Sequence, residues 1–351
     1  MASAIGLDIG SSAVRAVQLT GGKGGHTLDR LGQVMLPPGA VRDGEIVDPD
    51  AVVEALQILM SRYKFKGKKV ALGVANQQVV VRQVDLPSLP EAQLRESLPF
   101  QVQDYIPIPV DQALLDFEIL EEYANPDGTA MSRLLLVAAA REMVDELLAV
   151  MKKAKLEPVL LDLDAFALLR ALADEPAPVE EGQPRTVTTG ELIVNVGSTV
   201  TNIVVHSGGI PRFVRILLMG GNSVTESLQN SFGVSWEQAE AMKSAGHAPG
   251  SPEGSMISER AQRFIDEVRG SLDYYRAQGD SVQVERVILS GGGAELPNLA
   301  ERLAEAVRLP VDRGHPMQSL QIGKVDLEPA QLAEAEPFLA VAVGLAMGAL
   351  E

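Results

Sequence analysis

The same strand-turn-strand pattern occurs twice in this sequence, once in each half of the chain. The first copy is Ile5 to Leu19, IGLDIGSSAVRAVQL, and the second is Leu192 to His206, LIVNVGSTVTNIVVH. In both copies an apolar run leads into a short polar turn and a second apolar run leads out, which predicts a hairpin. A unit repeated once in each half of a chain predicts two similar domains that face each other across a cleft.

The turn of each copy carries residue types that suit a phosphate group. Gly10 allows the backbone to come close to a ligand, and Ser11 and Ser12 can donate to phosphate oxygens through amides and hydroxyls. Asp8 can hold a metal ion through water. The equivalent residues of the second copy are Asn195, Gly197, Ser198 and Thr199. A single turn of this kind is more typical of an ordinary hairpin, so the prediction of a phosphate site rests on the repetition.

A third loop rich in glycine follows in the second half. The buried-strand pattern Val287 to Leu289 ends in Ser290-Gly291-Gly292-Gly293-Ala294, before the helical pattern Leu296 to Val307. Taken in order, the three loops resemble the phosphate-1, phosphate-2 and adenosine motifs of the superfamily of actin, sugar kinases and heat-shock chaperone ATPases. This resemblance implies ATP and Mg²⁺ as cofactors, with Asp8 holding the metal through water.

Composition excludes several classes of partner. The 351 residues carry a formal net charge of −17, which argues against binding along nucleic acid and against attraction to anionic lipid. We expect no direct insertion into a membrane, because no apolar run is long enough and the start lacks the pattern of a signal peptide. The chain is therefore expected in the cytoplasm, reaching a membrane only through another protein. The four histidines are far apart and there is no cysteine, so no metal site of these residues is predicted.

Residues 78 to 155 have a composition and pattern of their own between the two copies of the repeat. We predict strands at Val79 to Leu86, Leu114 to Glu121 and Arg133 to Ala139, and helices at Pro90 to Tyr105 and Arg141 to Lys155. In the superfamily, an insert of this kind at this point resembles the SHS2-type subdomain of the cell-division protein FtsA. Asp174 to Thr189, rich in Pro, Glu and Thr, is predicted to be an exposed linker.

The pair Glu240 and Lys243 lies on one face of a predicted helix that opens at Trp236. An ion pair on a helix surface usually contributes little. However, Ala-Glu-x-x-Lys at this distance past Gly220-Gly221 resembles the helix that flanks the nucleoside in bacterial actin relatives. At the end of the chain, Pro337 to Leu350 is predicted as one helix with a face of small residues that packs closely. The basic amphipathic membrane helix that FtsA would require beyond it does not follow.

Further segments extend the resemblance over nearly the whole chain. They include DGEIVDPDAVVEAL, LPFQVQDYIPIPV, LLLVAAAREMVDELL, MGGNSVTESL and SLDYYRAQ. In order and spacing they resemble the PilM family of type IV pilus assembly proteins. The resemblance implies an α/β, actin-like ATPase fold with two ribonuclease H-like domains around a nucleotide cleft and an FtsA-like insert. It also implies a cytoplasmic protein that binds the N-terminal cytoplasmic tail of the inner-membrane protein PilN, within a pilus or type II secretion-like machine.

The resemblance assigns subdomains and site residues. The subdomain boundaries are 1–77, 156–189 and 331–351 for the first domain, 78–155 for the insert, and 190–235, 236–284 and 285–330 for the second domain. The residues expected at the phosphates and Mg²⁺ are Asp8, Gly10, Ser11, Ser12, Arg15, Asn195, Gly197, Ser198, Thr199 and Thr201. The residues expected at the nucleoside are Gly220, Gly221, Glu240, Lys243, Gly291, Gly292, Gly293 and Ala294.

One position departs from the family pattern. Members commonly have Asp where this chain has Asn195, and an amide supports a metal and its attacking water less well than a carboxylate does. We therefore expect ATP binding with weak or absent hydrolysis, and identify no catalytic base.

A docking site for the partner peptide is expected in the insert. The candidate groove residues are Val81, Val84, Phe100, Tyr105, Ile106 and Ile108, whose alternative role is to pack the core of the insert itself. Two other functions stay open at this point. One is a filament-forming protein like FtsA or MreB, or another homo-oligomer, and the other is a small-molecule kinase of the same superfamily, which would need a carboxylate base.

Overall fold

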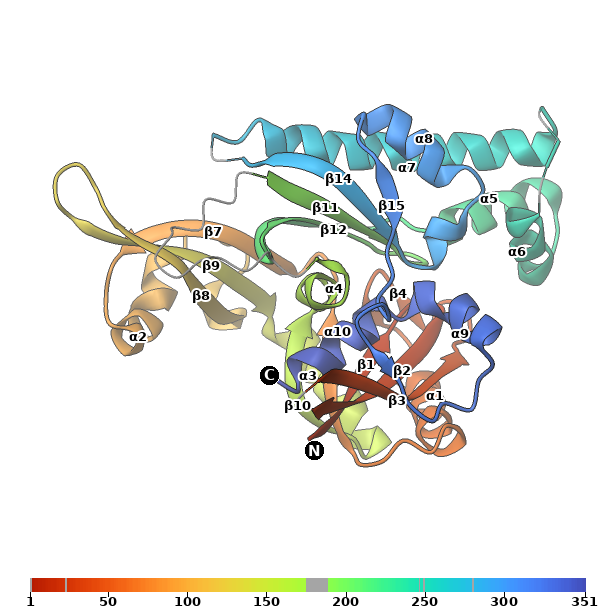
Figure 1. Cartoon of the computed structure of the whole chain (residues 1–351), viewed down its shortest axis with the longest axis horizontal. Helices are drawn as coiled ribbons and strands as arrows, with labels where there is room; N and C mark the ends of the chain where they lie inside the picture. Colours follow the sequence, from red (N-terminus) through yellow and green to blue (C-terminus); the bar gives the residue numbers. More distant parts are fainter. Residues whose placement is uncertain (1, 23, 175–188, 246, 249, 280) are drawn as a thin grey trace. The chain divides into compact units, whose positions relative to one another are not determined.

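The computed structural model describes residues 2–22, 24–174, 189–245, 247–248, 250–279 and 281–351 (Figure 1). Most of the predicted linker, residues 175–188, lies outside the described residues. The chain divides into two compact units. The first comprises Met1–Ala75 and Val150–Glu351, and the second comprises Asn76–Ala149, close to the span predicted for the insert.

In the described residues, the first unit contains two large sheets and one two-stranded hairpin, and the N-terminal repeat lies at the centre of the first large sheet. Strands β1 and β2 form the predicted hairpin, and β6 pairs with β1 in parallel. In order across the first sheet, the strands are β10 (Glu157–Leu163), β6 (Lys69–Val74), β1 (Ser3–Ile9), β2 (Ala13–Gly22), β3 (Gly25–Met35) and β16 (Gln321–Ile322). β3 is antiparallel to β2, and β10 is parallel to β6.

The second sheet repeats this topology. In order, its strands are β13 (Ile210–Leu217), β12 (Thr201–Ser207), β11 (Thr189–Val196), β14 (Gln283–Ser290) and β15 (Val311–Arg313). The pairs β11 with β12 and β12 with β13 are antiparallel, and the pairs β11 with β14 and β14 with β15 are parallel. Order and directions match β3-β2-β1-β6-β10, so the duplication predicted from the repeat is present in the fold.

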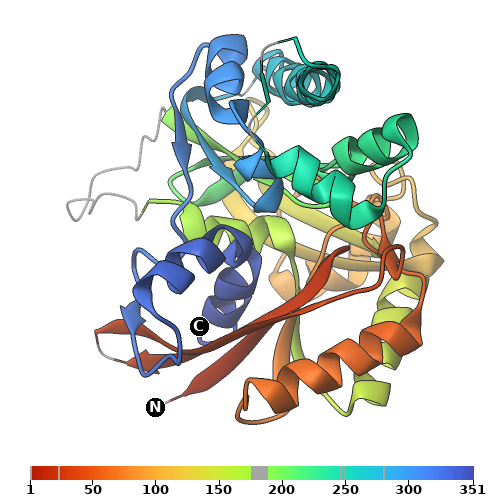
Figure 2. The same ribbon diagram turned by 90° about the vertical axis from the view of Figure 1, so that its right-hand side faces the viewer.

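Helices cover both sheets, and their ends follow local sequence signals. The Asp48 side chain accepts from the Ala51 N–H and caps α1, and Ser235 and Gln238 form a capping box at α6. The helices are α1 (Pro49–Arg62), α3 (Arg141–Ala154), α4 (Asp164–Leu172), α5 (Asn222–Phe232), α6 (Trp236–Ser244), α7 (Pro252–Arg276), α8 (Leu299–Val307), α9 (Pro329–Ala335) and α10 (Ala340–Gly348). A short hairpin, β4 (Val41–Arg42) with β5 (Glu45–Ile46), precedes α1. Figure 2 shows α1 on one face of the first sheet and α10 on the other.

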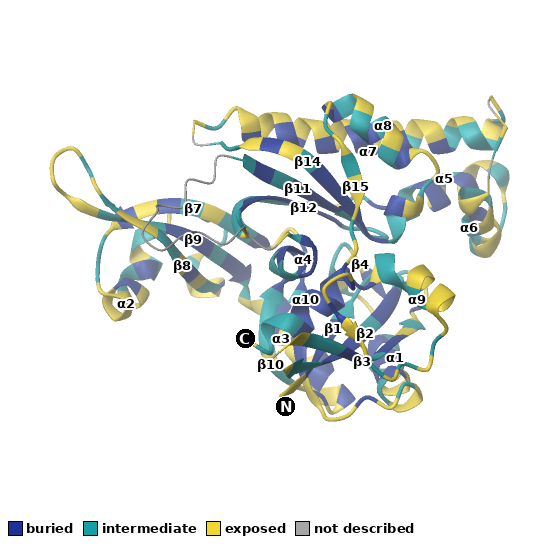
Figure 3. Ribbon diagram, viewed as in Figure 1, coloured by how far each residue is buried: buried dark blue, intermediate teal, exposed yellow. Residues whose placement is uncertain are grey.

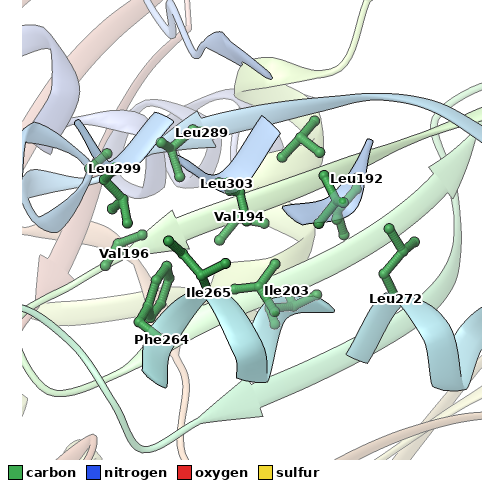
Figure 4. Packing of buried hydrophobic residues seen from close by; sticks show 14 of the residues in the cluster. Leu192, Val194, Val196, Ile203, Phe264, Ile265, Leu272, Leu289, Leu299 and Leu303 are labelled. Atoms are coloured by element: carbon green, nitrogen blue, oxygen red, sulfur yellow. The ribbon is translucent and has the colours of Figure 1, made fainter. Parts of the chain in front are cut away.

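Alternate residues of β11 face opposite sides of the second sheet, and this fixes where Asn195 points. Leu192, Val194 and Val196 are buried in one apolar cluster with α7 and α8 (Figure 4). The other members of the cluster include Ile203, Phe264, Ile265, Leu272, Leu289, Leu299 and Leu303. Because side chains alternate along a strand, Asn195 lies on the face away from this core.

The C-terminal segment is not the single helix predicted over Pro337 to Leu350. It forms a 3₁₀ turn, η3 (Glu336–Phe338), followed by α10, with the break at Leu339. The Pro337 carbonyl accepts from the Gly291 N–H at 3.1 Å, so it is bonded to another segment instead of to a helical turn. The predicted close packing of α10 is present: a Cβ placed on Gly344 would lie 1.8 Å from the Ala167 carbonyl oxygen. Figure 3 shows that α10 and α4 are largely buried.

Membrane-crossing character is weak in the part of the chain that the structure describes. There, no single helix is long and apolar enough to span a membrane. The bent pair Pro329–Phe338 and Ala340–Gly348, at 81°, passes on length and composition alone.

The second unit is a three-stranded antiparallel sheet with helical cover. Its strand order is β7 (Val79–Pro87), β9 (Ala130–Ala140) and β8 (Ala113–Ala124). The helix α2 (Glu91–Gln101) lies on it, with the short turn η1 (Val110–Gln112). The predicted helix end at Tyr105 is wrong, because α2 ends at Gln101. Pro107 and Pro109 follow closely and would each remove a helical N–H. Leu94 and Leu98 of α2 pack with Phe117 and Leu134 in the core of the unit.

Candidate functional site

The two repeated turns have the same backbone geometry. The Gly10 N–H donates to the Ala13 carbonyl at 3.1 Å, and the Gly197 N–H donates to the Val200 carbonyl at 2.9 Å. We call residues 8–12 the first loop and residues 195–199 the second loop. Gly197 is required by its turn, since a Cβ there would lie 2.6 Å from the Val200 carbonyl oxygen, whereas a Cβ on Gly10 would meet the Ala13 carbonyl oxygen at 3.3 Å.

The first and second loops meet through their side-chain hydroxyls. The Oγ of Ser11 lies 2.6 Å from Oγ1 of Thr199, and the Ser198 hydroxyl donates to Oγ of Ser12 at 2.8 Å. Because the loops are equivalent, the two bonds are related by a pseudo-two-fold exchange. The Asp43 N–H also donates to Oγ1 of Thr199, at 3.2 Å.

The amides of these loops remain available to a ligand. Among the described residues, no hydrogen bond uses the N–H groups of Ser11, Ser12, Ser198 or Thr199. Successive backbone N–H groups in a turn form a concave site for an anion. The geometry therefore fits phosphate oxygens at the joint between the two loops.

Asp8 and Arg15 face each other as register partners on β1 and β2. Their charged atoms lie 3.7 Å apart, and both side chains are less than 15% exposed. Burial raises the pKa of the Asp8 carboxyl above its ordinary value, and the Arg15 guanidinium offsets part of this effect. Arg15 also donates from Nε to Oε1 of Gln33 at 2.8 Å. A cation is thus held beside the first loop.

Asp164, at the start of α4, is a site residue that the sequence reasoning missed. Burial, followed by the charges of Asp8 and Asp162, raises the pKa of Asp164 well above its ordinary value. Asp162 itself pairs with Arg170, which leaves Asp164 as the second acid next to Asp8. The available signal was an acid directly after a buried parallel strand, where the carboxyl ends of neighbouring strands meet.

The equivalent position in the second sheet is neutral throughout. Asn195 has Asn202 as its partner on β12 and Ser290 as its partner on β14. Asn202 and Ser290 are buried, and within the described chain Oδ1 of Asn202 and Oγ of Ser290 have no hydrogen-bond partner. Thr201, expected at the phosphates, is buried and donates its hydroxyl to the Met219 carbonyl at 2.7 Å.

Most residues expected at the nucleoside gather around one pocket. It encloses about 530 Å³, counted out to its open mouth, and Gly220, Gly221, Lys243, Gly292 and Gly293 line it. The other lining residues are Val196, Ser223, Val224, Ser244, Arg260, Ala261, Phe264, Glu295, Leu296 and Leu299. Apolar walls with a few charged groups at the edge suit a nucleoside.

Three of the expected nucleoside residues do not line this pocket: Glu240, Gly291 and Ala294. Glu240 contacts a residue that lines the pocket, because Lys243 Nζ donates to Oε1 of Glu240 at 2.7 Å. Lys243 Nζ also donates to Oγ1 of Thr225 at 2.9 Å. Arg260 reaches the pocket from α7 without having been predicted. Nothing in the helical pattern of α7 distinguishes Arg260 from the surface arginines of the same helix. The sequence therefore did not indicate that Arg260 lines the pocket.

The three glycines of the third loop are required by protein neighbours. Gly291 has a φ of +87°, and a Cβ on it would lie 2.4 Å from the Val196 carbonyl oxygen. A Cβ on Gly293 would lie 2.5 Å from Cγ1 of Val196. A Cβ on Gly292 would lie 2.4 Å from the ring of Phe338. Gly292, which was expected at the nucleoside, therefore also needs its small size because of the Phe338 ring.

The candidate groove residues of the second unit fall into two groups. Val84 and Ile106 are buried in its core, at 4% and 7% exposure, and Ile108 packs against that core. Phe100 and Tyr105 are 78% and 41% exposed, and Val81 is half-buried. The exposed aromatic pair, with Val81, is the part of the set that a peptide can reach.

Comparison with known proteins decides the family. The family model of the type IV pilus assembly protein PilM matches residues 6–350. The chain belongs to this family.

The PilM chain of a structure described as the PilM-PilN type IV pilus biogenesis complex is 28% identical, with a TM-score of 0.85. The match covers 99% of this chain and 98% of that chain. The ethanolamine utilization protein EutJ from Carboxydothermus hydrogenoformans is 14% identical, with a TM-score of 0.59 and coverage of 99% and 90%. MreB5 of Spiroplasma citri bound to ADP is 14% identical, with a TM-score of 0.52 and coverage of 97% and 94%.

These matches establish the fold as that of actin-like ATPases, as the sequence resemblance implied. The last two matches carry the fold alone. In the described part of the chain, no group of three or more His, Cys, Asp or Glu side chains could hold a metal ion directly.

Proposed function

We propose that this PilM family member binds ATP in its first unit. The phosphates lie at the joint of the first and second loops beside Arg15, and the nucleoside lies in the pocket next to Gly221 and Lys243. The observation that carries this proposal is the meeting of the two loops. In the part of the chain that the structure describes, the N–H groups of Ser11, Ser12, Ser198 and Thr199 there have no hydrogen-bond partner.

Mg²⁺ fits beside the first loop. Two acids, Asp8 and Asp164, repel each other there, and a cation would favour their charged forms. We propose that Asp8 holds Mg²⁺ through water, where the ion would neutralise phosphate charge. Since Asn195 is neutral, we propose slow hydrolysis at most.

The nucleotide site can be tested by filling the pocket. A Cβ on Gly221 has ordinary contacts, the nearest being Lys243 Nζ at 3.6 Å, so Gly221→Val should fold and occupy nucleoside space. Calorimetry should detect no ATP binding by this variant. Gly270→Val, where nothing lies within 4 Å of a Cβ, is the control and should bind normally. Equal affinity of both variants would disprove the assignment of the pocket.

We also propose that the chain binds the N-terminal cytoplasmic tail of a PilN-like inner-membrane protein. It would then act in the cytoplasm, next to the inner membrane, in assembly of a type IV pilus. Support comes from the match at 28% identity over nearly the whole of both chains to a PilM in a PilM-PilN complex. The exposed residues Phe100 and Tyr105 are the proposed anchors, because aromatic side chains commonly carry most of the energy of an interface.

A fluorescent peptide with the first residues of the cognate membrane protein tests the partner, with and without ATP. Phe100→Ser and Tyr105→Ser should each weaken peptide binding about tenfold. Tyr274→Ser, which removes a 61% exposed aromatic side chain on α7, is the matched control. If the peptide did not bind the unaltered chain, the proposed partner would be wrong. If it bound all three variants equally well, only the assignment of Phe100 and Tyr105 as anchors would be wrong.

A further inference from the structure

The turn η3 (Glu336–Phe338) is held in place by three contacts with other segments. Besides the bond from Gly291 to Pro337, the Met317 N–H donates to Oε1 of Glu336 at 3.2 Å. His315 Nδ1 lies 3.3 Å from the other carboxylate oxygen. The Phe338 side chain that this turn presents is nevertheless 36% exposed, so burial alone does not account for its place.

The ring of Phe338 touches both parts of the proposed nucleotide site. On one side it lies against Gly292, where no Cβ would fit. The Arg15 guanidinium carbon lies 5.5 Å from the centroid of the same ring, within the range of a cation–π contact. Arg15 belongs to the first sheet and Gly292 follows β14 of the second. One ring thus connects the cation beside the first loop with the wall of the nucleoside pocket.

Arg15 is confined by three neighbours of different kinds. Gln33 holds Nε, Asp8 attracts the guanidinium, and the Phe338 ring covers it. Without the ring, a long side chain gains rotamer freedom, which must be lost again when a phosphate binds. A cation held in position before binding avoids that loss.

We propose that Phe338 is a positioning residue for the phosphates, acting through Arg15. This inference rests on the proposed function, since Arg15 is there assigned to the phosphate groups. The ring keeps the guanidinium in the orientation that phosphate requires, and it also lies against Gly292 of the glycine loop. The ring therefore contributes to the affinity for the phosphate groups and not to the affinity for the nucleoside.

The test compares three ligands on Phe338→Leu, which keeps apolar bulk against Gly292 but has no ring face. Calorimetry should give an ATP affinity about fivefold weaker, the value expected when one long side chain must be ordered on binding at a cost of about 1 kcal/mol. ADP affinity should fall by less, and adenosine affinity should not change. Phe338→Tyr keeps the ring and should restore ATP binding. Thermal unfolding of each variant checks that the fold is kept.

A double-mutant cycle with Arg15→Gln decides whether the effect passes through Arg15. In the Arg15→Gln background, Phe338→Leu should leave ATP affinity unchanged. An equal loss in both backgrounds, an equal loss for adenosine, or no loss at all would overturn the positioning role while leaving ATP binding intact. If the unaltered chain bound no ATP, both the proposed ATP-binding function and this inference would be disproved.

Discussion

The first and second loops share one backbone and differ in charge. Asp8 and Arg15 are register partners in the first sheet, and Asn195 and Asn202 occupy the equivalent places in the second. The second sheet therefore has two amides at the places where the first sheet has an acid and a cation. A buried charge is tolerated only beside a partner, so a change at one of these positions favours a change at the other.

The difference assigns separate roles to the two loops. The first loop contains Asp8 and has Arg15 and Asp164 beside it, which is why phosphate charge and Mg²⁺ are proposed there. The second loop offers amides and hydroxyls without charge, and its neighbours Asn202 and Ser290 keep unpaired buried atoms. The duplicated fold thus carries an asymmetric site, in which the chemistry of charge belongs to one side.

The largest effect is expected from removing the cation of the first loop. Arg15→Gln takes away the phosphate charge partner and leaves Asp8 buried alone, so ATP affinity should fall about 100-fold. Calorimetry with ATP measures it. Asn202→Ser, at the equivalent place in the second sheet, is the matched control and should change affinity less than about threefold. Similar losses in both variants would mean that the two loops contribute alike.

The next effect comes from giving the second loop an acid. Asn195→Asp places a carboxylate beside Asn202 and Ser290, which are neutral. Because the new charge has no partner on these strands, the free energy of unfolding should fall by about 1–3 kcal/mol at neutral pH. Phosphate release from ATP should rise in the same variant, because the metal and its water gain a charged partner. Urea unfolding and a phosphate assay measure the two. Brisk turnover by the unaltered chain would contradict the role given to Asn195.

A smaller effect concerns the pH dependence that Asp164 creates. Its pKa is raised in the folded chain, so the folded state binds the proton more tightly than the unfolded state does. Stability should therefore decrease as pH rises from the ordinary aspartate pKa through the raised one. Asp164→Asn should remove this decrease, at about 1.4 kcal/mol per unit of pKa difference. Urea unfolding from pH 4 to 8 would show parallel curves if Asp164 were not responsible.

The smallest effect tests the contact between the loops. Thr199→Val removes the hydroxyl that bonds Ser11 and the Asp43 N–H, and should lower stability by about 0.5–1.5 kcal/mol without nucleotide. Ser11→Ala combined with it should cost little more, since both changes remove the same bond. Strictly additive losses would show that the loops do not meet in solution.

Sequence predicted what is local and missed what depends on distant packing. The turns at Gly10 and Gly197 could be predicted, because all the residues that determine a strand-turn-strand unit lie within about fifteen positions of the sequence. The terminal helix was predicted without its break, since the break depends on Gly291 donating to Pro337. Phe338 acquires its surroundings from segments far away in the chain, and no spacing in the sequence brings it to the first loop. Asp164 could have been found from its place directly after the strand β10.

The bonds between Ser11 and Thr199 and between Ser198 and Ser12 change what a phosphate gains by entering. The hydroxyls already have partners, so a phosphate oxygen exchanges one set of hydrogen bonds for another of similar strength. The net gain from these hydroxyls is small, and the joint stays closed on itself when nucleotide is scarce. Discrimination between a phosphate group and water at this joint then depends on the unpaired loop amides and on the charge that Arg15 supplies. A neutral ligand of the same shape would gain less than a phosphate from displacing these hydroxyl contacts.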